Sequence, residues 1–458
     1  MTRKRNIAWC SLLVILLTPW VWAASPTPDQ LPSPLKAITL KNGDTFVFLG
    51  DSITHQCLYT QYFEDYVYTR FPQIRVRFHN SGVGGDRVGD ALIRFERDVA
   101  HYKPKYVSIL LGMNDGRYQK FDEATFEVYR EGMLKLLEKI RATGATPILM
   151  HPTMFDSRAV LLRNPNATGE RLEYYNGVLA YYGAWLREVV YRQGGGYVDM
   201  YSWLNLVTFS RRKEDPRFTL IPDAVHPGPA GHVIMAAAMV RDLGLPHEVW
   251  RLHIDAAGET PKVITAVRCA VRDLKCEGDR LSFVLHTEAL PWVVPPEAQL
   301  GAELIHLGPR FSRETLRITG LAPGLYAVSA NGESLGRFSA ARLAVGVQLQ
   351  DIPQWPLRRQ AAQVAALNKQ RNEQAVRPLR NLWSQKKRLR FARAALEQRP
   401  DDQRLKTQVQ RLEQTLSDFE AQIATLEEKA AGFEARIREA AQPKPVSVVI
   451  ERVESPND

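Results

Sequence analysis

The sequence predicts an α/β protein with three layers, α/β/α, around a parallel sheet, followed by a small β-rich module and a C-terminal antiparallel helical hairpin. Three observations predict this order. Short apolar runs alternate with helical patterns from residue 37 to 250, turn-separated apolar runs fill residues 251–355, and a heptad repeat follows Pro356. Alternating strands and helices are typical of a parallel sheet with helices on both faces. A chain of 458 residues is also too long for one ordinary domain.

The N-terminus has the pattern of a secretory signal. Basic residues at positions 3–5 precede a mostly apolar run over residues 7–18, and a small-residue cleavage pattern ends at Ala23. We therefore predict a signal peptide over residues 1–23 and a periplasmic or secreted protein. An uncleaved N-terminal membrane anchor is the alternative, although the apolar run is shorter than a full membrane span.

Residues 37–250 carry the predicted parallel sheet. Ligands of such sheets bind beyond the carboxyl ends of the strands, so the residues that follow each strand are the first candidates for a site. The candidate strands are 46–49, 74–78, 106–111, 146–150 and 197–200, and the helical patterns between them are 58–70, 122–143 and 170–193.

Four short blocks in this region supply the groups that acyl transfer needs. Three of them follow predicted strands, and the fourth precedes a helix that begins near Pro229. The blocks are Gly50-Asp51-Ser52-Ile53, Asn80-Ser81-Gly82-Val83-Gly84-Gly85-Asp86, Gly112-Met113-Asn114-Asp115 and Asp223-Ala224-Val225-His226-Pro227.

The blocks predict a serine nucleophile with its base and its oxyanion donors. A serine hydroxyl is a poor nucleophile unless a base takes its proton, and His226 is the best base for Ser52 because Asp223 on the same turn can orient it. The tetrahedral intermediate needs preorganised donors. The candidates are the N–H groups of Ser52 and Gly85 and the side-chain amide of Asn114.

Together the blocks resemble those of the SGNH (GDSL-type) hydrolases over residues 40–250. The resemblance implies a flavodoxin-like α/β/α fold and hydrolysis of esters or thioesters, often acetyl esters of carbohydrates. By motif, the family's catalytic residues fall on Ser52, Asp223 and His226, and its oxyanion asparagine falls on Asn114. Its oxyanion glycine falls on Gly85, with Gly82 and Gly84 near enough for a shift of register.

Each block alone has a plainer interpretation, because Gly-Asp-Ser and Gly-x-Asn-Asp are common turns and Asp-x-x-His can start a helix. Their ordered occurrence favours catalysis. Thr54 stands where an α/β-hydrolase elbow needs glycine, and Arg87 stands where a dinucleotide fingerprint needs its third glycine. No metal or cofactor is expected. His55 is an alternative base or substrate contact, although a structural role is favoured.

Residues 251–355 form the predicted β-rich module. Its strand-like runs are 262–271, 281–286, 316–319 and 326–329, with turns at 322–324 and 331–332. Cys269 and Cys276 flank a predicted turn between two strands, so they can pair in an oxidising compartment. The sequence does not decide whether they do.

The helical hairpin is predicted over residues 356–442. Apolar residues from Leu405 to Ile437 alternate spacings of four and three, which is a heptad seam typical of a coiled coil. An earlier basic helix, 376–398, would pack against it through its leucines. Pairing with another subunit is the alternative. Within residues 443–458 a final strand is expected to return to the β-rich module, which would make the hairpin an insertion. The seam leucines of the basic helix are Leu382, Leu389 and Leu396.

The net charge of +10 is concentrated in one segment. Eleven lysines and arginines lie between Arg358 and Arg393, against one acid, Glu373. The plainer interpretation is a solvated helix surface, and the sharper one is a docking face over residues 358–393 for an anionic envelope polymer or a membrane surface. No nucleic-acid partner is expected.

The sequence thus predicts an exported serine esterase that hydrolyses acyl esters through an acyl-enzyme. The O-acetylated carbohydrate substrate rests on the resemblance and on the predicted export. Three alternatives remain: an esterase or thioesterase for lipids or small acyl compounds, an acyltransferase to a sugar, and an envelope interaction protein that carries a hydrolase-like domain.

Overall fold

The computed structural model describes residues 32–258 and 260–453. The predicted signal peptide lies outside these residues. None of the helices in the two described ranges has the length and hydropathy that a membrane span requires.

A five-stranded parallel sheet in the order β2-β1-β3-β4-β5 forms the middle layer of the first domain. Every residue of β1 and β3 is buried, as expected for a sheet that is covered on both faces. The predicted α/β fold class is confirmed. The strands are β1 (Thr45–Gly50), β2 (Arg77–Gly82), β3 (Tyr106–Leu110), β4 (Thr146–Met150) and β5 (Gly196–Val198).

β2 differs from the predicted strand 74–78, because it starts later and continues to Gly82. Its last residues, Asn80 to Gly82, are polar or small but pair in register with Phe48 to Gly50 of β1. A hydrophobic pattern cannot reveal a strand whose buried residues are polar, and the second sequence block therefore begins inside the sheet.

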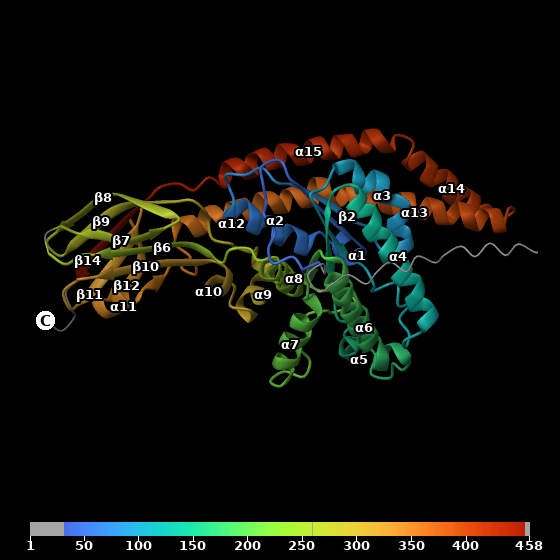
Figure 1. Ribbon diagram of the computed structural model, residues 1–458, viewed down its shortest axis with the longest axis horizontal. Helices are drawn as coiled ribbons and strands as arrows, with labels where there is room; N and C mark the ends of the chain where they lie inside the picture. The colour runs from blue at the N-terminus through green and yellow to red at the C-terminus, as the bar shows by residue number, and fades with distance from the viewer. Residues whose placement is uncertain (1–31, 259, 454–458) are drawn as a thin grey trace, which may run out of the picture.

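Helices cover both faces of the sheet (Figure 1). α2 (Leu58–Arg70) and α8 (Pro229–Asp242) lie on one face, and α3 (Val88–Asp98), α4 (Glu123–Ala142) and α6 (Glu170–Gln193) lie on the other. The remaining helices of this domain are α1 (Ser52–His55), η2 (Ala100–Tyr102), α5 (Ser157–Arg163) and α7 (Met200–Arg212).

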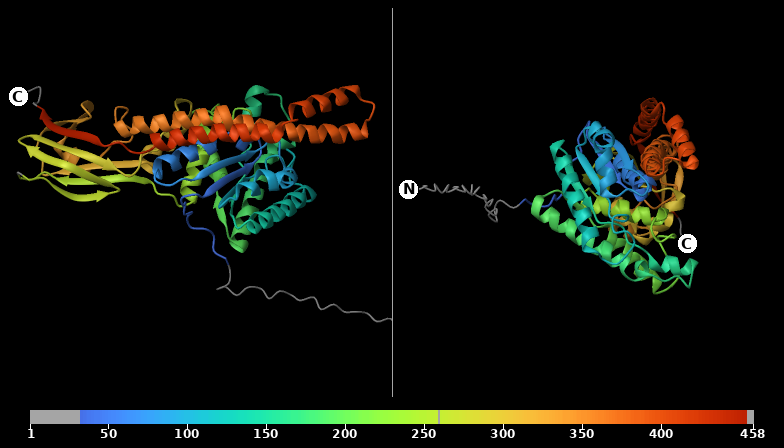
Figure 2. Two further views of the ribbon diagram at one scale, coloured as in Figure 1. Left: turned by 90° about the horizontal axis from the view of Figure 1, so that it is seen from above. Right: turned by 90° about the vertical axis from the view of Figure 1, so that its right-hand side faces the viewer.

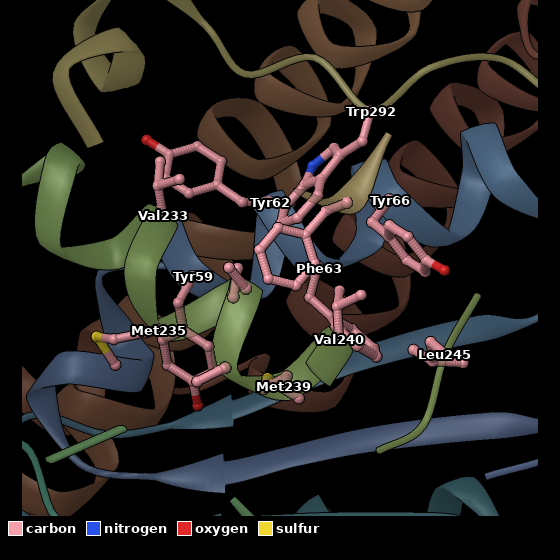
Figure 3. Close-up of a cluster of buried hydrophobic side chains, with 14 of the residues drawn as sticks. Tyr59, Tyr62, Phe63, Tyr66, Val233, Met235, Met239, Val240, Leu245 and Trp292 are labelled. Carbon is pink, nitrogen blue, oxygen red and sulfur yellow. The ribbon is translucent and has the colours of Figure 1, made fainter. Parts of the chain in front are cut away.

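α2 is buried around almost its whole circumference, and Figure 3 shows its inner side. Tyr59 and Phe63 lie over the strands beside Met239 of α8, while Trp292, which follows β9 (Arg280–Thr287), packs at the far end. The other side of α2 carries Glu64 and Asp65, which are also buried. Burial of two carboxylates requires partners from another part of the chain.

Two further sheets form the β-rich part. Their orders are β13-β10-β6-β7 and β12-β11-β14-β9-β8. Buried residues alternate with exposed ones along β10 and β14, as expected for sheets with one covered face. The strands are β6 (Glu248–Asp255), β7 (Lys262–Val267), β8 (Cys269–Glu277), β9 (Arg280–Thr287), β10 (Arg313–Thr319), β11 (Leu325–Ala330), β12 (Glu333–Ser339), β13 (Val347–Gln348) and β14 (Val446–Val453).

Helices also occur in this part of the chain: η3 (Pro296–Ala298), α9 (Gln299–Leu304), α10 (Leu307–Phe311) and α11 (Ala340–Val345). α9 packs on α8 of the first domain. The contact is close at Gly301, where an added Cβ would lie 2.4 Å from the carbonyl oxygen of Ala230. A segment predicted to be β-rich thus joins the two parts through a helix.

The predicted turn between Cys269 and Cys276 is wrong. Both residues lie in the single strand β8. At about 3.3 Å per residue the strand separates them by roughly 20 Å, whereas a disulfide spans about 7 Å at most. The two thiols are free and do not pair with each other.

The C-terminal helices form a hairpin that runs along the length of the molecule (Figure 2). At its outer end, Leu389 packs with Val409 and Leu396. The predicted seam is not continuous, because the return arm is interrupted between Thr415 and Phe419. The outgoing arm is α12 (Pro356–Arg371), the π-helical η4 (Asn372–Val376) and α13 (Arg377–Gln398), and the return arm is α14 (Gln403–Thr415) and α15 (Phe419–Ala440). The chain then enters β14, between β11 and β9.

The basic segment of the outgoing arm, residues 358–393, faces the first domain. The interpretation of this segment as a solvated helix surface is therefore wrong for its buried residues. Arg371 and Arg380 have side chains that are 3% and 0% exposed. Seven of the eleven basic residues pair with acids elsewhere in the chain. These pairs are Arg359–Glu333, Lys369–Glu297, Arg371–Glu64, Arg380–Asp98, Lys387–Asp86, Arg390–Asp90 and Arg393–Glu413.

The central contact of this interface is the buried pair of Arg380 and Asp98. Arg380 donates to both carboxylate oxygens, at 2.8 and 2.5 Å, and its Nε donates to the carbonyl of Gly82 at the end of β2. Arg94 reaches the same carboxylate from α3 and also donates to the carbonyl of Gly50. Burial alone would raise the pKa of Asp98, but Arg380 and its other hydrogen-bond donors lower it overall.

We expect Asp98→Asn to lower the free energy of unfolding by about 3–5 kcal/mol, because Arg380 would remain as a buried charge without a carboxylate. Urea unfolding followed by circular dichroism measures this change. Glu214→Gln, which removes an exposed partner of Arg211, is the matched control and should leave the midpoint unchanged. Equal midpoints for Asp98→Asn and the unmodified protein would contradict the central position of this pair.

Candidate active site

The carboxyl ends of three adjacent strands bring three of the predicted blocks together. Ser52 follows β1, the loop at residues 83–86 follows β2, and the loop at 112–115 follows β3. β1 lies between the other two strands, so both loops flank Ser52. The fourth block, residues 223–227, precedes α8 and reaches the same edge of the sheet.

Ser52 is the first residue of α1, on a sharp turn out of β1. Asp51 caps this turn by accepting the N–H of Ile53 at 2.9 Å. Gly50 permits the turn, because an added Cβ would lie 2.1 Å from Oγ1 of Thr54 and 2.8 Å from the carbonyl oxygen of Leu110. The sequence thus forces the chain to turn where the sheet ends and leaves Ser52 half-buried at its edge.

Ser52, His226 and Asp223 form one hydrogen-bonded chain. Oγ of Ser52 lies 2.8 Å from Nε2 of His226, and Nδ1 of the same ring lies 2.6 Å from Oδ2 of Asp223. The other carboxylate oxygen accepts the N–H groups of Val225 and His226, across a turn in which Ala224 has a left-handed φ of 78°. This arrangement can take a proton from a serine as the serine attacks.

The electrostatics of this chain favour an ionised Asp223. Partial burial raises its pKa, but the hydrogen bonds from the backbone and ring of His226 outweigh that effect, and the net shift is downward. An ionised carboxylate at Nδ1 holds the proton on that nitrogen and leaves Nε2 free to accept the proton of Ser52.

Free N–H groups lie beside Ser52. The N–H groups of Ser52, Gly84 and Gly85 have no hydrogen-bond acceptor within the part of the chain that the structure describes. Gly85 is exposed and has a φ of 68°, a conformation that favours glycine. These groups are available to an oxyanion, and the structure leaves both Gly84 and Gly85 open as donors.

Asn114 is oriented by a residue that the sequence analysis missed. The hydroxyl of Tyr118 donates to Oδ1 of Asn114 at 3.1 Å, so the amide nitrogen points the other way, where it donates to the carbonyl of Asp86 at 3.1 Å. Burial raises the pKa of Tyr118 to about 12, so the hydroxyl keeps its proton. Nothing in the sequence marks this tyrosine apart from its place four residues after Asn114.

Two acidic residues of the blocks hold the loops in shape. Asp115 accepts the N–H groups of Val88 and Gly112, at 2.9 and 3.0 Å, and burial raises its pKa to about 6. Asp86 accepts from Arg94 and from Lys387 of α13, at 2.8 Å each. Both carboxylates are thus occupied with loop contacts.

His55 faces the hairpin. Its Nε2 lies 2.9 Å from Oδ1 of Asn381 and its Nδ1 lies 3.3 Å from Oγ of Ser384, so α13 holds both ring nitrogens. Burial and the charges of Arg380 and Arg377 lower its pKa. Both nitrogens therefore contact groups other than Ser52, which favours the structural role for His55.

α13 forms one wall of the cleft above Ser52. The buried side chain of Val83 packs under Leu379 and Trp383, and Lys387 donates to the carbonyl of Gly84 at 3.2 Å. This contribution could not be predicted from the sequence, because the helix lies far from the four blocks along the chain. The cleft has a volume of about 610 Å³ and is lined by Ser52, His55, Gln56, Leu58, Gly84, Asp223, His226 and Arg377.

Parts of the chain are similar in sequence to known proteins. The model of the GDSL-like lipase/acylhydrolase family matches residues 48–234. The chain is 25% identical over 225 residues to an acetylxylan esterase of Geobacillus stearothermophilus, covering 44% of this chain and 95% of that enzyme. It is also 37% identical over 73 residues to the uncharacterized lipoprotein YqeF of Bacillus subtilis, covering 16% of this chain and 30% of that protein.

A solved structure shares nearly the whole architecture. The gut microbial diltiazem-metabolizing enzyme BT4096 superposes with a TM-score of 0.77 and 22% identity, covering 91% of this chain and 99% of that one. At this identity the likeness concerns the fold. Because it extends well beyond residues 48–234, it includes β-rich and helical parts as well as the α/β domain.

We expect Ser52 to react covalently with a fluorophosphonate, because His226 can take its proton. Peptide mass spectrometry should locate one adduct on Ser52, and His226→Ala should slow labelling by about a hundredfold or more. An adduct on a different residue, or an unchanged rate in His226→Ala, would show that this serine is not activated.

We also expect Tyr118→Phe to lower kcat for ester hydrolysis about tenfold with little change in KM, because it removes a hydrogen bond that orients Asn114. Initial rates with p-nitrophenyl acetate measure both constants. Tyr174→Phe, on the exposed side of α6, is the control and should behave like the unmodified enzyme. A normal kcat in Tyr118→Phe would mean that Asn114 keeps its orientation without the tyrosine.

Proposed function

We propose that the protein is an exported serine esterase that removes O-acetyl groups from a carbohydrate. The premise is that residues 48–234 are a domain of the SGNH (GDSL-type) hydrolase family and that the protein is a carboxylic-ester hydrolase. The observation that carries the proposal is the hydrogen-bonded chain of Ser52, His226 and Asp223 at the cleft.

In the proposed mechanism, Oγ of Ser52 attacks the acyl carbonyl while Nε2 of His226 takes the hydroxyl proton. The carbonyl oxygen becomes an oxyanion, which accepts hydrogen bonds from the N–H groups of Ser52 and Gly85 and from the amide of Asn114. His226 then gives its proton to the alcohol as the ester bond breaks. A water molecule, activated by the same imidazole, attacks the acyl-enzyme and releases the acid and Ser52.

The exposure and the lining of the cleft favour a substrate with a large alcohol part and a small acyl group. The side chains of His226 and Asp223 are 34% and 46% exposed, so the site lies near the surface, where a polymer can reach it. Among the residues that line the cleft, Leu58 is the one with a large aliphatic side chain. A single aliphatic side chain offers few contacts to a long acyl chain.

The carbohydrate and the export have separate support. The relative that matches over 95% of its length is named an acetylxylan esterase, so an acetylated polysaccharide is the first substrate to test. Export rests on the signal pattern of residues 1–23. A protein released from the cytoplasm meets polysaccharides that a cytoplasmic enzyme does not.

We expect Ser52→Ala to lower the rate of p-nitrophenyl acetate hydrolysis by thousands-fold or more, because the nucleophile is lost. Initial rates of the purified variant and the unmodified enzyme test this. Circular dichroism checks that the variant is folded. Equal rates would rule out Ser52 as the nucleophile.

The substrate class is tested by acetate release. We expect acetylated xylan or another O-acetylated polysaccharide to yield acetate with the unmodified enzyme and none with Ser52→Ala. We expect p-nitrophenyl octanoate to react at least tenfold more slowly than the acetate, because the cleft offers a long chain few apolar contacts. Faster hydrolysis of the octanoate would favour a lipid esterase.

A further inference from the structure

Arg377 of α13 lines the catalytic cleft together with Ser52 and His226 and has no acidic partner there. Its Nη2 donates to the carbonyl of Gln56 at 2.9 Å. Its Nε is buried and finds no acceptor. Arg377 forms no ion pair with any residue that the structure describes, whereas Arg371 and Arg380 on the same arm are paired with buried carboxylates.

An arginine in this state can still bind an anion. The guanidinium is always charged and presents five N–H donors in a planar fork that matches a carboxylate. Arg371 and Arg380 of the same arm use this fork on acidic residues of the chain. The fork of Arg377 keeps unused donors beside the nucleophile, which is the arrangement expected of a group that binds an anion from outside.

The sequence holds Arg377 at this position. It is the first residue of α13 and follows the π-helical turn Asn372–Val376. Pro378 comes next, and because proline has no N–H to donate to the preceding turn, a wider turn relieves the conflict without ending the helix. The neighbouring Val376 and Leu379 are buried. The guanidinium is therefore carried by a fixed backbone, and π turns of this kind often occur at functional sites.

The surroundings of the guanidinium are cationic. The pKa of His55 is lowered by burial and by the positive charges of Arg380, Arg377 and Arg388. The carboxylate that lines the cleft, Asp223, is already bound to His226. A negatively charged group on a substrate would thus be attracted by these positive charges, and Asp223 would compete little with it for Arg377.

We propose that Arg377 binds a carboxylate on the alcohol part of the substrate, so that the enzyme prefers O-acetylated acidic sugars, such as hexuronates, to neutral ones. The inference rests on the proposed function, because an acetyl group carries no charge and the carboxylate must then belong to the sugar. The cleft has a guanidinium where an apolar side chain could have bound an acyl chain. Selection therefore acts on the alcohol part of the substrate and not on the acyl group.

A purely structural role for Arg377 makes a different prediction. If its one task were to bind the carbonyl of Gln56, its loss would disturb the turn after Ser52 and lower the activity on every ester. Recognition of a carboxylate confines the loss to acidic substrates and places it mainly in KM. A substrate pair that differs in the carboxylate separates the two roles.

The experiment compares acetate release from an O-acetylated methyl glucuronoside and the matching O-acetylated methyl glucoside. We expect the unmodified enzyme to favour the acid at least tenfold in kcat/KM. Arg377→Gln should lose about 10–100-fold on the acid and less than about threefold on the neutral sugar, since a charge-assisted pair is removed. Arg404→Gln removes the same charge from an exposed position of the hairpin and is the matched control. Equal ratios for all three proteins, or an equal loss on both sugars, would overturn the proposal.

Two further measurements separate this inference from the proposed function. Hydrolysis of p-nitrophenyl acetate by Ser52→Ala tests the nucleophile alone. Calorimetric binding of the acetylated glucuronoside to Ser52→Ala, and to the same variant with Arg377→Gln, tests the carboxylate site without turnover. Tenfold weaker binding in the double variant supports the site even if the esterase mechanism fails. Equal binding overturns the site even if the mechanism holds.

Discussion

The buried ion pair of Arg380 and Asp98 is the contact on which the arrangement of the site depends. It joins the hairpin to α3, and through Gly82 it fixes the end of β2, from which the loop that flanks Ser52 emerges. Neither residue can be buried alone, because an unpaired charge in the interior is costly. The α/β domain and the hairpin therefore complete each other. The hairpin helices thus contact the loop beside Ser52, although none of them carries a residue of the four blocks.

The local part of the site could be predicted from the sequence. Ser52, Asn114, Asp223 and His226 lie in short motifs whose turns are determined by neighbouring residues, and parallel strands bring such motifs to one edge. Tyr118 and Arg377 could not be predicted, because their positions depend on tertiary packing. The same limit explains why the sequence predicts β2 too early, since the polar end of this strand contacts Thr54 and Arg380 in the interior.

The charge pattern of the hairpin shows where sequence reasoning fails. A helix with many lysines and arginines is normally a solvated surface. Here some of the acids that neutralise it, namely Glu64, Asp90 and Asp98, lie on α2 and α3, and they too look like ordinary surface residues in the sequence. Only the fold shows that Glu64 and Arg371 face each other. Two charged surfaces that each look exposed in the sequence can thus be buried against each other. The apolar residues of the return arm, by contrast, can be predicted from their spacing alone.

The position of β14 has a consequence for the order in which the molecule is assembled. This strand follows the other four strands of its sheet in the chain, yet it lies in the middle of the sheet, between β9 and β11. The sheet cannot be completed until the whole hairpin has been made and has turned back, so its middle strand is added late. Contacts between residues so distant in sequence form slowly. A chain that stops before β14 thus contains Ser52 but leaves β9 and β11 without the strand that joins them.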